Sequence, residues 1–382
     1  MVDVKMDRLT KRVLSKALEI GFDVVGITEP KDAWTYEHFE RWLEMGFAGE
    51  MAYMARTKEL RRNPKMLMSD CKSIVVVGIG YAMTKDDAGE KTQHTPKGKV
   101  SIYACRQDYH DVIRAKLLEL GRWLAEQVKW AKFKACVDTS PILERELAVN
   151  AGIGWFGKNT NVINERLGSY FFIGELLTNV ELEQTEGLRE KQCSDCNRCI
   201  NSCPTGALVS PMVLDARLCI SYLTIEHRGA IPTELRPLIG EWVFGCDICQ
   251  QVCPCNDNVS VNGTMNELAI RHDLVAPNLL DWIKLTEDEF NKLFFGTPIL
   301  RIGRERLLRN VAIALGNVGD ERAVEPLAML LRSERSSLIR SHVVWALSRI
   351  GGKKALHALK LHWSHERDEA VRAEIEKAIE DR

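Results

Sequence analysis

A short cysteine motif constrains this chain more than any other feature of its sequence. Cys193, Cys196, Cys199 and Cys203 follow the pattern C-x2-C-x2-C-x3-C-P, which ends at Pro204. Two-residue gaps let one loop bring three thiolates to a cubane cluster, while the fourth cysteine of this pattern ligates a second cluster. The proline then turns the chain away from the ligand loop. The motif therefore predicts iron–sulfur chemistry.

A second, partial motif completes the ligand set. Cys246, Cys249 and Cys253 are followed by Pro254 in the pattern C-x2-C-x3-C-P, and Cys219 precedes them at a longer distance. Two-cluster bacterial ferredoxins exchange ligands between their motifs. We therefore predict two [4Fe–4S] clusters that fold as one unit. The first would be held by Cys193, Cys196, Cys199 and Cys253, and the second by Cys203, Cys219, Cys246 and Cys249.

Zinc is the alternative metal, because paired C-x2-C elements also form tetrahedral structural sites. Two C-x3-C-P endings favour clusters over zinc. A disulfide framework suits short secreted chains, whereas this chain has 382 residues and its cysteines are concentrated in one region. Cys71, Cys105 and Cys136 have no partners at ligand spacing, and we expect them to be small buried hydrophobic residues.

The bulk composition is that of an ordinary globular protein, with 45% hydrophobic and 27% charged residues. No stretch reaches the roughly 18 uncharged apolar residues that a membrane span needs. The first residues alternate charged and apolar positions and do not resemble a signal peptide. We expect a cytoplasmic protein without a membrane association, and a monomer.

The first 180 or so residues mix helical and strand periodicities, which predicts an α/β or α+β domain. Amphipathic helices are predicted at residues 6–20 and 112–129. Short apolar runs at 23–28, 73–81, 100–104 and 133–138 predict strands. Residues 84–99 are polar and predict an exposed loop, while 161–181 predict a β-hairpin that turns near residues 166–168.

Beyond residue 297 the sequence repeats with a 32-residue period. Leu307, Ile339 and Val371 occupy equivalent positions in successive repeats. Such a period predicts stacked helix pairs, similar to a short HEAT array that packs on the preceding domain. Residues 301–382 contain 16 Lys and Arg against 12 Asp and Glu, which hints at an anionic partner, although a solvated helical surface explains the charge equally well.

Two further segments carry candidate sites. Residues 152–159 nearly match a phosphate-binding P-loop, but Asn159 stands where Ser or Thr would ligate magnesium, and a hairpin is predicted to follow in place of a helix. We therefore reject nucleoside triphosphate binding. Asp138 ends a predicted strand, where it either meets a ligand or caps the next helix, and the residues alone favour the cap.

Several long segments together resemble the epoxyqueuosine reductase family. They are residues 138–145 (DTSPILER), 154–160 (GWFGKNT), 219–226 (CISYLTIE) and 309–317 (RNVAIALGN). The resemblance implies an oxidoreductase that reduces the epoxide of epoxyqueuosine at the tRNA wobble position to queuosine. It also implies cobalamin, fed with electrons by the two clusters and ultimately by an unidentified electron donor.

The resemblance implies three domains. Residues 1–185 would form the cobalamin-binding catalytic domain, which is similar to that of reductive dehalogenases. Residues 186–265 would form a ferredoxin-like double-cluster domain, and residues 266–382 an all-α domain of HEAT-like repeats.

The same resemblance assigns roles to individual residues. Asp138 matches the family's proton donor, which overturns the cap interpretation, and burial should raise its pKa for that role. Other residues would border the cobalamin or substrate pocket, namely Arg61, Ser101, His110, Arg145, Lys158, Ser221 and Asp247. Basic residues of the repeats would contact tRNA phosphates, namely Arg304, Arg306, Arg309, Lys353 and Lys354.

Two positions depart from the family pattern. Cys255 stands where tryptophan is usual, which puts the choice of cluster ligand in doubt, and Arg106 stands where a small residue is common. Two other functions remain open at this stage. One is a reductive dehalogenase-like reductase of a small molecule, which the repeats argue against, and the other is a ferredoxin-type electron carrier, which leaves the first 180 residues without a purpose.

Overall fold

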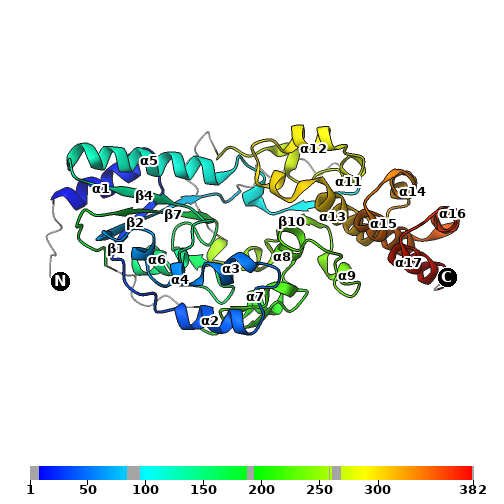
Figure 1. The fold of residues 1–382 in the computed structure, drawn as a ribbon, viewed down its shortest axis with the longest axis horizontal. Coiled ribbons are helices and arrows are strands. Elements are labelled where there is room, and N and C mark those ends of the chain that lie inside the picture. The colour runs from blue at the N-terminus through cyan, green and yellow to red at the C-terminus, as the bar shows by residue number, and fades with distance from the viewer. Residues whose placement is uncertain (1–7, 84–94, 187–192, 258, 260–267, 381–382) are drawn as a thin grey trace.

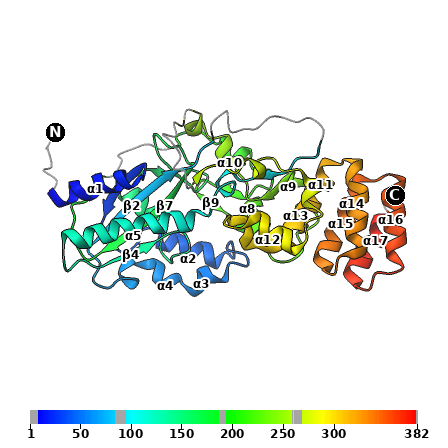
Figure 2. The same ribbon diagram turned by 90° about the horizontal axis from the view of Figure 1, so that it is seen from above.

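The computed structural model describes residues 8–83, 95–186, 193–257, 259 and 268–380. The molecule is elongated, with a sheet-containing part at the N-terminal end, the cysteine region near the middle and a helical array at the C-terminal end (Figures 1 and 2). Among the described helices, none is long and apolar enough to cross a bilayer.

The N-terminal part is built on a four-stranded sheet with the order β1-β2-β7-β4. Its strands are β1 (Val24–Thr28), β2 (Ser73–Gly80), β7 (Phe171–Thr178) and β4 (Phe133–Cys136). All three pairings are antiparallel, so this part is α+β. Every residue of β2 is buried, because the strand is central and both faces of the sheet are covered.

Helices cover the two faces of the sheet differently. Figure 1 shows α1 (Arg8–Ile20) and α5 (Tyr109–Gln127) on one face, and α6 (Glu144–Asn150) on the other. Successive residues of β7 alternate between them: Phe172 packs with the α1–α5 core and Phe171 with the α6 core. Further helices flank the α6 side, namely α2 (Tyr36–Glu44), α3 (Ala52–Arg56) and α4 (Lys58–Arg62).

Most predicted elements of this part are confirmed. The second predicted helix begins three residues earlier than expected, at Tyr109, because the Asp108 side chain caps it by accepting a hydrogen bond from the His110 amide. The run 100–104 is only partly a strand. β3 (Lys99–Val100) pairs in parallel with β10 (Trp242–Phe244), and a 3-10 turn follows.

The predicted hairpin at residues 161–181 is wrong in its pairing. A tight turn is present, with a bridge between Asn164 and Gly168. However, β6 (Val162–Ile163) pairs with β5 (Trp155–Phe156), while β7 joins the central sheet. Strand β5 lies within the glycine-rich segment 152–159 and pairs with β6 just after it, so no helix follows this segment, as predicted. Residues 84–94 of the predicted loop lie outside the described residues.

The cysteine region has only short elements, as expected where metal ligation replaces a hydrophobic core. They are α7 (Arg198–Asn201), β8 (Leu208–Ser210), β9 (Val213–Leu214), α8 (Ile220–Ile225), α9 (Arg236–Ile239) and α10 (Ile248–Gln251).

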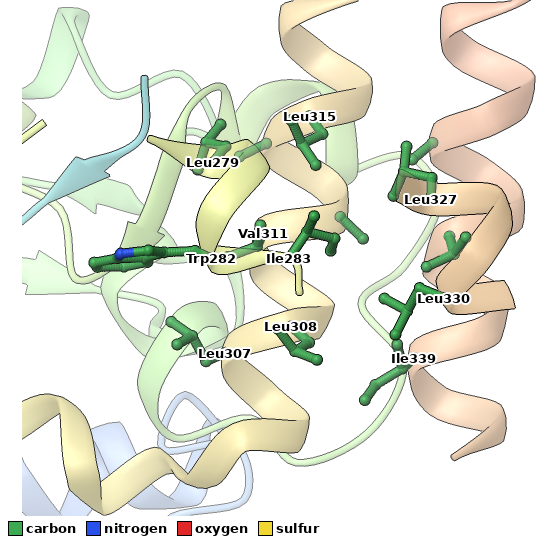
Figure 3. Close-up of a cluster of buried hydrophobic side chains, with 14 of the residues drawn as sticks. Leu279, Trp282, Ile283, Leu307, Leu308, Val311, Leu315, Leu327, Leu330 and Ile339 are labelled. Atoms are coloured by element: carbon green, nitrogen blue, oxygen red, sulfur yellow. The ribbon is translucent and has the colours of Figure 1, made fainter. Parts of the chain in front are cut away.

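The C-terminal helices confirm the 32-residue period. Leu307, Ile339 and Val371 are all at most 1% exposed and share one core. Figure 3 shows this core between Leu279 and Trp282 on one side and the repeat helices on the other. The helices are α11 (Leu279–Trp282), α12 (Glu287–Phe294), α13 (Gly303–Val318), α14 (Val324–Ser333), α15 (Ser337–Ile350), α16 (Gly352–Trp363) and α17 (Glu369–Glu380).

Helix α13 joins the repeats to the cysteine region through buried polar groups. The Arg309 guanidinium is fully buried and donates to the Leu223 carbonyl oxygen at 2.7 Å. Asn310 donates to the carbonyl oxygens of Thr224 and Val243. Because these carbonyls would otherwise be buried without donors, the two side chains fix the repeats against α8 and β10.

The phosphate-contact prediction is therefore wrong for Arg309 and stays a prediction for the other four basic residues. Arg309 is buried, and Arg304 and Arg306 donate to backbone carbonyls within the protein. Lys353 and Lys354 are exposed at the start of α16 and remain available to an anionic partner.

Candidate active site and cluster-binding region

Four cysteines gather in one group, as the second predicted cluster requires. Burial, together with the charges of the neighbouring Cys219 and Cys203, raises the pKa of Cys246 to about 12. Burial also raises the pKa of Cys249, with additional effects of Cys246 and Cys219. Like charges act this way only at short range, so Cys203, Cys219, Cys246 and Cys249 lie near one another.

The other predicted ligands form a second group. Burial raises the pKa of Cys199, and its neighbours Cys193 and Cys196 raise it further. Cys253 comes to this group from the second motif, since Cys193 contributes to its raised pKa. Cys199 in turn contributes to the raised pKa of Cys249. The two groups are therefore neighbours, as two clusters that exchange electrons must be.

The structure also bears on zinc and on Cys255. Among the described residues, no three His, Cys, Asp or Glu side chains form the compact group that one metal ion needs. Cys255 is exposed and lies beside Cys253, which is buried. Cys253 remains the predicted ligand.

Lys158 lies against the first cluster loop. Its backbone N–H points at the Cys193 sulfur, with 3.5 Å between the nitrogen and Sγ. Its ammonium group donates to the Ser194 carbonyl oxygen and to Asn197 Oδ1, both at 2.8 Å. The sequence assigned Lys158 to the cobalamin pocket, whereas these contacts make it a brace of the ligand loop.

Asp138 follows β4 in a left-handed backbone conformation, with φ at +39°. This conformation is unfavourable for a residue with a side chain and is concentrated at functional sites. Asp138 is not a helix cap, because α6 begins at Glu144 and Leu143 occupies its cap position. The Asp138 side chain is 48% exposed, so it is accessible to a substrate.

A chain of charged groups holds Asp138. His110 Nε2 lies 2.9 Å from Asp138 Oδ2, and His110 Nδ1 lies 2.7 Å from Asp108 Oδ1. Arg301 donates to Asp108 Oδ2 from both Nε and Nη2. The Tyr109 hydroxyl also bonds to Asp138. This network joins the start of α5 to the segment before α13, and both ring nitrogens of His110 face carboxylates.

The network sets the protonation of its members. Burial of His110 opposes its charge, but the hydrogen bonds to Asp108 and Asp138 outweigh burial and raise its pKa to about 9. The pKa of Asp138 is lowered, because the His110 hydrogen bond and charge outweigh its desolvation. The expectation that burial raises the Asp138 pKa is wrong. At neutral pH the proton lies on His110, and Asp138 is ionised.

Glu144 is a neighbour of Asp138 that the sequence did not single out. Burial and the Asp138 charge raise its pKa to about 7, because they outweigh the opposing charges of Arg145 and Arg61. Arg61 is buried and donates to the Ile142 carbonyl oxygen at 3.0 Å, which supports the loop between Asp138 and α6. Glu144 lies within the motif 138–145, so only its role was unpredicted.

The other predicted pocket residues lie on other elements, and of these Arg145 interacts electrostatically with Asp138. Ser101 and Asp247 are each 1% exposed and bond to each other at 2.6 Å. Asp247 also accepts from the Ile102 amide, so this pair connects β3 to the Cys246–Cys249 loop. Ser221 is partly exposed on α8, two residues after Cys219. Arg145 donates to Thr160 at the hairpin between β5 and β6.

Arg106 does not lie at a pocket entrance. It is fully buried and donates to the carbonyl oxygens of Tyr81, Ala82 and Leu268. The large side chain therefore holds the end of β2 in place of a small residue.

The surroundings of Asp138 fit a bound redox cofactor. Its open carboxylate interacts electrostatically with Tyr53 on α3 and with Glu226, which follows α8. Cys219 forms the N-terminal cap of α8, so this short helix connects the second cysteine group to the region of Asp138. A cofactor between α3 and α8 would have both a cluster and a proton donor beside it.

Comparisons with known proteins agree with this arrangement. Three family models match: "Epoxyqueuosine reductase QueG, DUF1730" at residues 61–139, "4Fe-4S double cluster binding domain" at 192–256 and "HEAT repeats" at 298–380. The double-cluster match settles the metal as iron in [4Fe–4S] clusters, so zinc is excluded.

Curated relatives and solved structures extend the likeness over the whole chain. The epoxyqueuosine reductase of Pseudomonas aeruginosa is 41% identical over 341 residues, covering 89% of this chain and 94% of the relative. That of Escherichia coli is 39% identical and covers 90% of both.

Two solved structures are also similar. A crystal structure of epoxyqueuosine reductase with an epoxyqueuosine-modified tRNA-Tyr stem loop is 31% identical, with a TM-score of 0.91 over 97% of this chain and 98% of the other. The Bacillus subtilis enzyme, with its catalytic aspartate loop swung out of the active site, has a TM-score of 0.89 at 30% identity over the same shares. The chain belongs to the epoxyqueuosine reductase family.

Proposed function

We propose that this protein reduces the epoxide of epoxyqueuosine in tRNA to queuosine, with Asp138 as the acid that protonates the departing oxygen. The observation that carries the proposal is the half-exposed Asp138 carboxylate bonded at 2.9 Å to a protonated His110. A solved relative is described with an epoxyqueuosine-modified stem loop, which supports the same substrate for this chain.

The reaction defines what the residues must do. Removing an epoxide oxygen to leave an alkene takes two electrons and two protons and releases water. The [4Fe–4S] clusters carry electrons one at a time, and cobalamin supplies the low-potential reactive centre when it is bound. The chain must therefore deliver protons to a developing oxygen anion and keep the substrate oriented.

Asp138 and His110 supply the proton together. As negative charge develops on the oxygen, Asp138 Oδ2 passes on a proton that His110 Nε2 shares with it. Asp108 holds the other ring nitrogen and stabilises the imidazolium before transfer. The left-handed backbone at Asp138 aims the carboxylate away from β4 and toward solvent. The proton available at neutral pH is therefore held by the His110 imidazolium, and not by a buried, neutral Asp138 carboxyl group.

We assign the remaining predicted residues by their position. Arg61, His110, Arg145 and Ser221 border or support the space where cobalamin would bind. Ser101, Asp247 and Lys158 support this space indirectly, because their hydrogen bonds hold the cluster-binding loops in place. The predicted cluster ligands stay as the motifs gave them, and Lys353 and Lys354 contribute to tRNA binding.

Organisation and context complete the proposal. We retain the three predicted domains, although β3 and β10 join the first to the second. A tRNA substrate favours the cytoplasm. We also propose that the protein acts as a monomer with a separate electron donor, which size-exclusion chromatography and reduction assays would test.

The test reconstitutes clusters and cobalamin without oxygen, adds a strong reductant and measures queuosine formed in epoxyqueuosine-containing tRNA. Asp138→Asn should bind cobalamin with unchanged affinity and lose turnover by at least about 100-fold, the usual range for a general acid. Asp70→Asn is the matched control, because Asp70 lies before β2 and bonds to Lys132. Near-normal turnover of Asp138→Asn would contradict the acid role, and absence of cobalamin binding would contradict the proposal itself.

A further inference from the structure

A pocket of about 190 Å³ opens beside the Asp138 loop. The first turns of α5 contribute His110, Asp111 and Arg114, and the segment after β4 contributes the hydroxyl residues Thr139 and Ser140. Arg301, which precedes α13, closes the pocket from the C-terminal side. The pocket is therefore formed jointly by the catalytic part and the helical part of the chain.

Cationic groups converge on this pocket. His110 is protonated at neutral pH, and its Nε2 lies 3.4 Å from Arg301 Nη1. Two positive donors at this distance repel each other unless an acceptor lies near both. Asp108 engages Nε and Nη2 of Arg301, which leaves Nη1 directed to the side of His110 and the pocket.

Arg114 adds a third positive charge. Its side chain lines the pocket and is exposed, and it has no hydrogen-bond or ion-pair partner among the residues that the structure describes. Asp108, Asp138 and Asp111 balance the three cations, so the group as a whole carries no net charge. What the pocket offers an anion is the guanidinium of Arg114 and the Nη1 group of Arg301, since Asp108 engages the other donors of Arg301.

The position of the pocket identifies the class of anion. It adjoins the acid that must meet the modified base, so its occupant has to be compatible with bound tRNA. A nucleotide whose base reaches Asp138 brings its own flanking phosphodiesters, and two arginine forks match the oxygens of a phosphate. A free anion would instead compete with the substrate for the same space.

We propose that this pocket binds a backbone phosphate of the tRNA next to the nucleotide being reduced, with Arg114 and Arg301 as its partners. The inference rests on the proposed function and deepens it. A phosphate held here fixes the distance between the modified base and Asp138, and it ties α5 to the segment before α13 when RNA binds. Arg114 is a positioning residue in this scheme.

The test compares binding of an epoxyqueuosine-containing anticodon stem loop by the holoenzyme and by Arg114→Gln at several salt concentrations. Loss of one phosphate contact should lower the affinity roughly tenfold at low salt and reduce the slope of log K against log salt by about one. Arg122→Gln is the matched control. It removes the same charge from an exposed position on α5 outside the pocket, and it should change neither quantity.

A second arm assigns the contact to a phosphate. Two stem loops would each carry one neutral methylphosphonate, on one side or the other of the modified nucleotide. The one that lacks the contacted phosphate should bind the wild type more weakly than the unmodified stem loop does. With that stem loop, Arg114→Gln should bind as tightly as the wild type. Full affinity and an unchanged slope in Arg114→Gln would overturn the inference, as would equal effects of Arg114→Gln and Arg122→Gln. Turnover by the wild type is measured in parallel, so failure of the proposed function is recognised separately.

Discussion

His110 Nε2 lies 2.9 Å from Asp138 Oδ2, and this contact reverses the protonation that burial alone would give Asp138. The carboxylate stays ionised while the imidazole carries the proton. A carboxylate–imidazolium pair at the open side of a redox site can release one proton without requiring a neutral carboxyl group at rest.

The first prediction concerns the pH dependence of turnover. Because the pKa of His110 is raised to about 9, kcat should stay level through neutral pH and fall as pH rises through about 9, where His110 loses its proton. Asp108→Asn removes a carboxylate that raises this pKa, so the fall should begin at lower pH. Asparagine still caps α5, which preserves the helix. An alkaline limb at the same pH in both proteins would contradict the assignment.

The second prediction concerns Lys158 and the first cluster. Lys158→Met removes the two 2.8 Å bonds that hold the ligand loop at Ser194 and Asn197. Reconstituted Lys158→Met should retain the second cluster but contain less iron, and its first cluster should be lost faster in air. Iron analysis and EPR after timed exposure measure both effects. Lys134→Met, a change at an exposed position on β4, is the control, and equal iron content in the two variants would contradict the bracing role.

The cysteine motifs and the repeat period were predictable because each is encoded locally. Cys193 to Cys203 lie close together in the sequence, and positions 32 residues apart occupy equivalent places in α13, α15 and α17 of successive repeats. The contact between Asp108 and Arg301 joins residues 193 positions apart, and no local sequence pattern predicts it. Pairing of β3 with β10 is hidden in the same way, since strands of two and three residues have no periodicity of their own.

A charged residue can be assigned to the surface or to the interior only once its burial is known. Arg309 and Lys353 look alike in a count of basic residues, yet Arg309 is fully buried and Lys353 is exposed. Similarly, Asp138 looked like a helix cap because a polar residue after a strand commonly is one. Its left-handed backbone and its bond to His110 become visible only in three dimensions.

The third prediction separates these two classes of basic residue. Arg309→Met removes the donors of buried carbonyls, including that of Leu223, and should destabilise the protein by about 3 kcal/mol in denaturant unfolding. Lys353→Glu with Lys354→Glu should leave the unfolding midpoint unchanged and weaken tRNA binding, most strongly at low salt. Unchanged tRNA affinity in the double variant would move the RNA contacts to another surface.

The fourth prediction concerns Glu175, which lies in β7 opposite Cys136 and is 0% exposed. Neither carboxyl oxygen has a hydrogen-bond partner among the described residues. Burial raises its pKa well above the ordinary value, and the charges of Glu144 and Asp138 raise it further. The folded protein therefore keeps Glu175 protonated over a range of pH in which the unfolded chain has already ionised it.

The sign of the effect on stability follows from this difference. The unfolded carboxyl ionises as pH rises above about 4.5, so each further pH unit costs the folded state up to about 1.4 kcal/mol until Glu175 ionises in the fold as well. Glu175→Gln removes this cost, and its gain in unfolding free energy over the wild type should grow between pH 5 and pH 8. Glu146→Gln, on the same side of the sheet but with its carboxylate bonded to Trp34 and Thr35, should instead lose stability. A constant difference between Glu175→Gln and the wild type across this range would show that Glu175 is ionised in the folded protein.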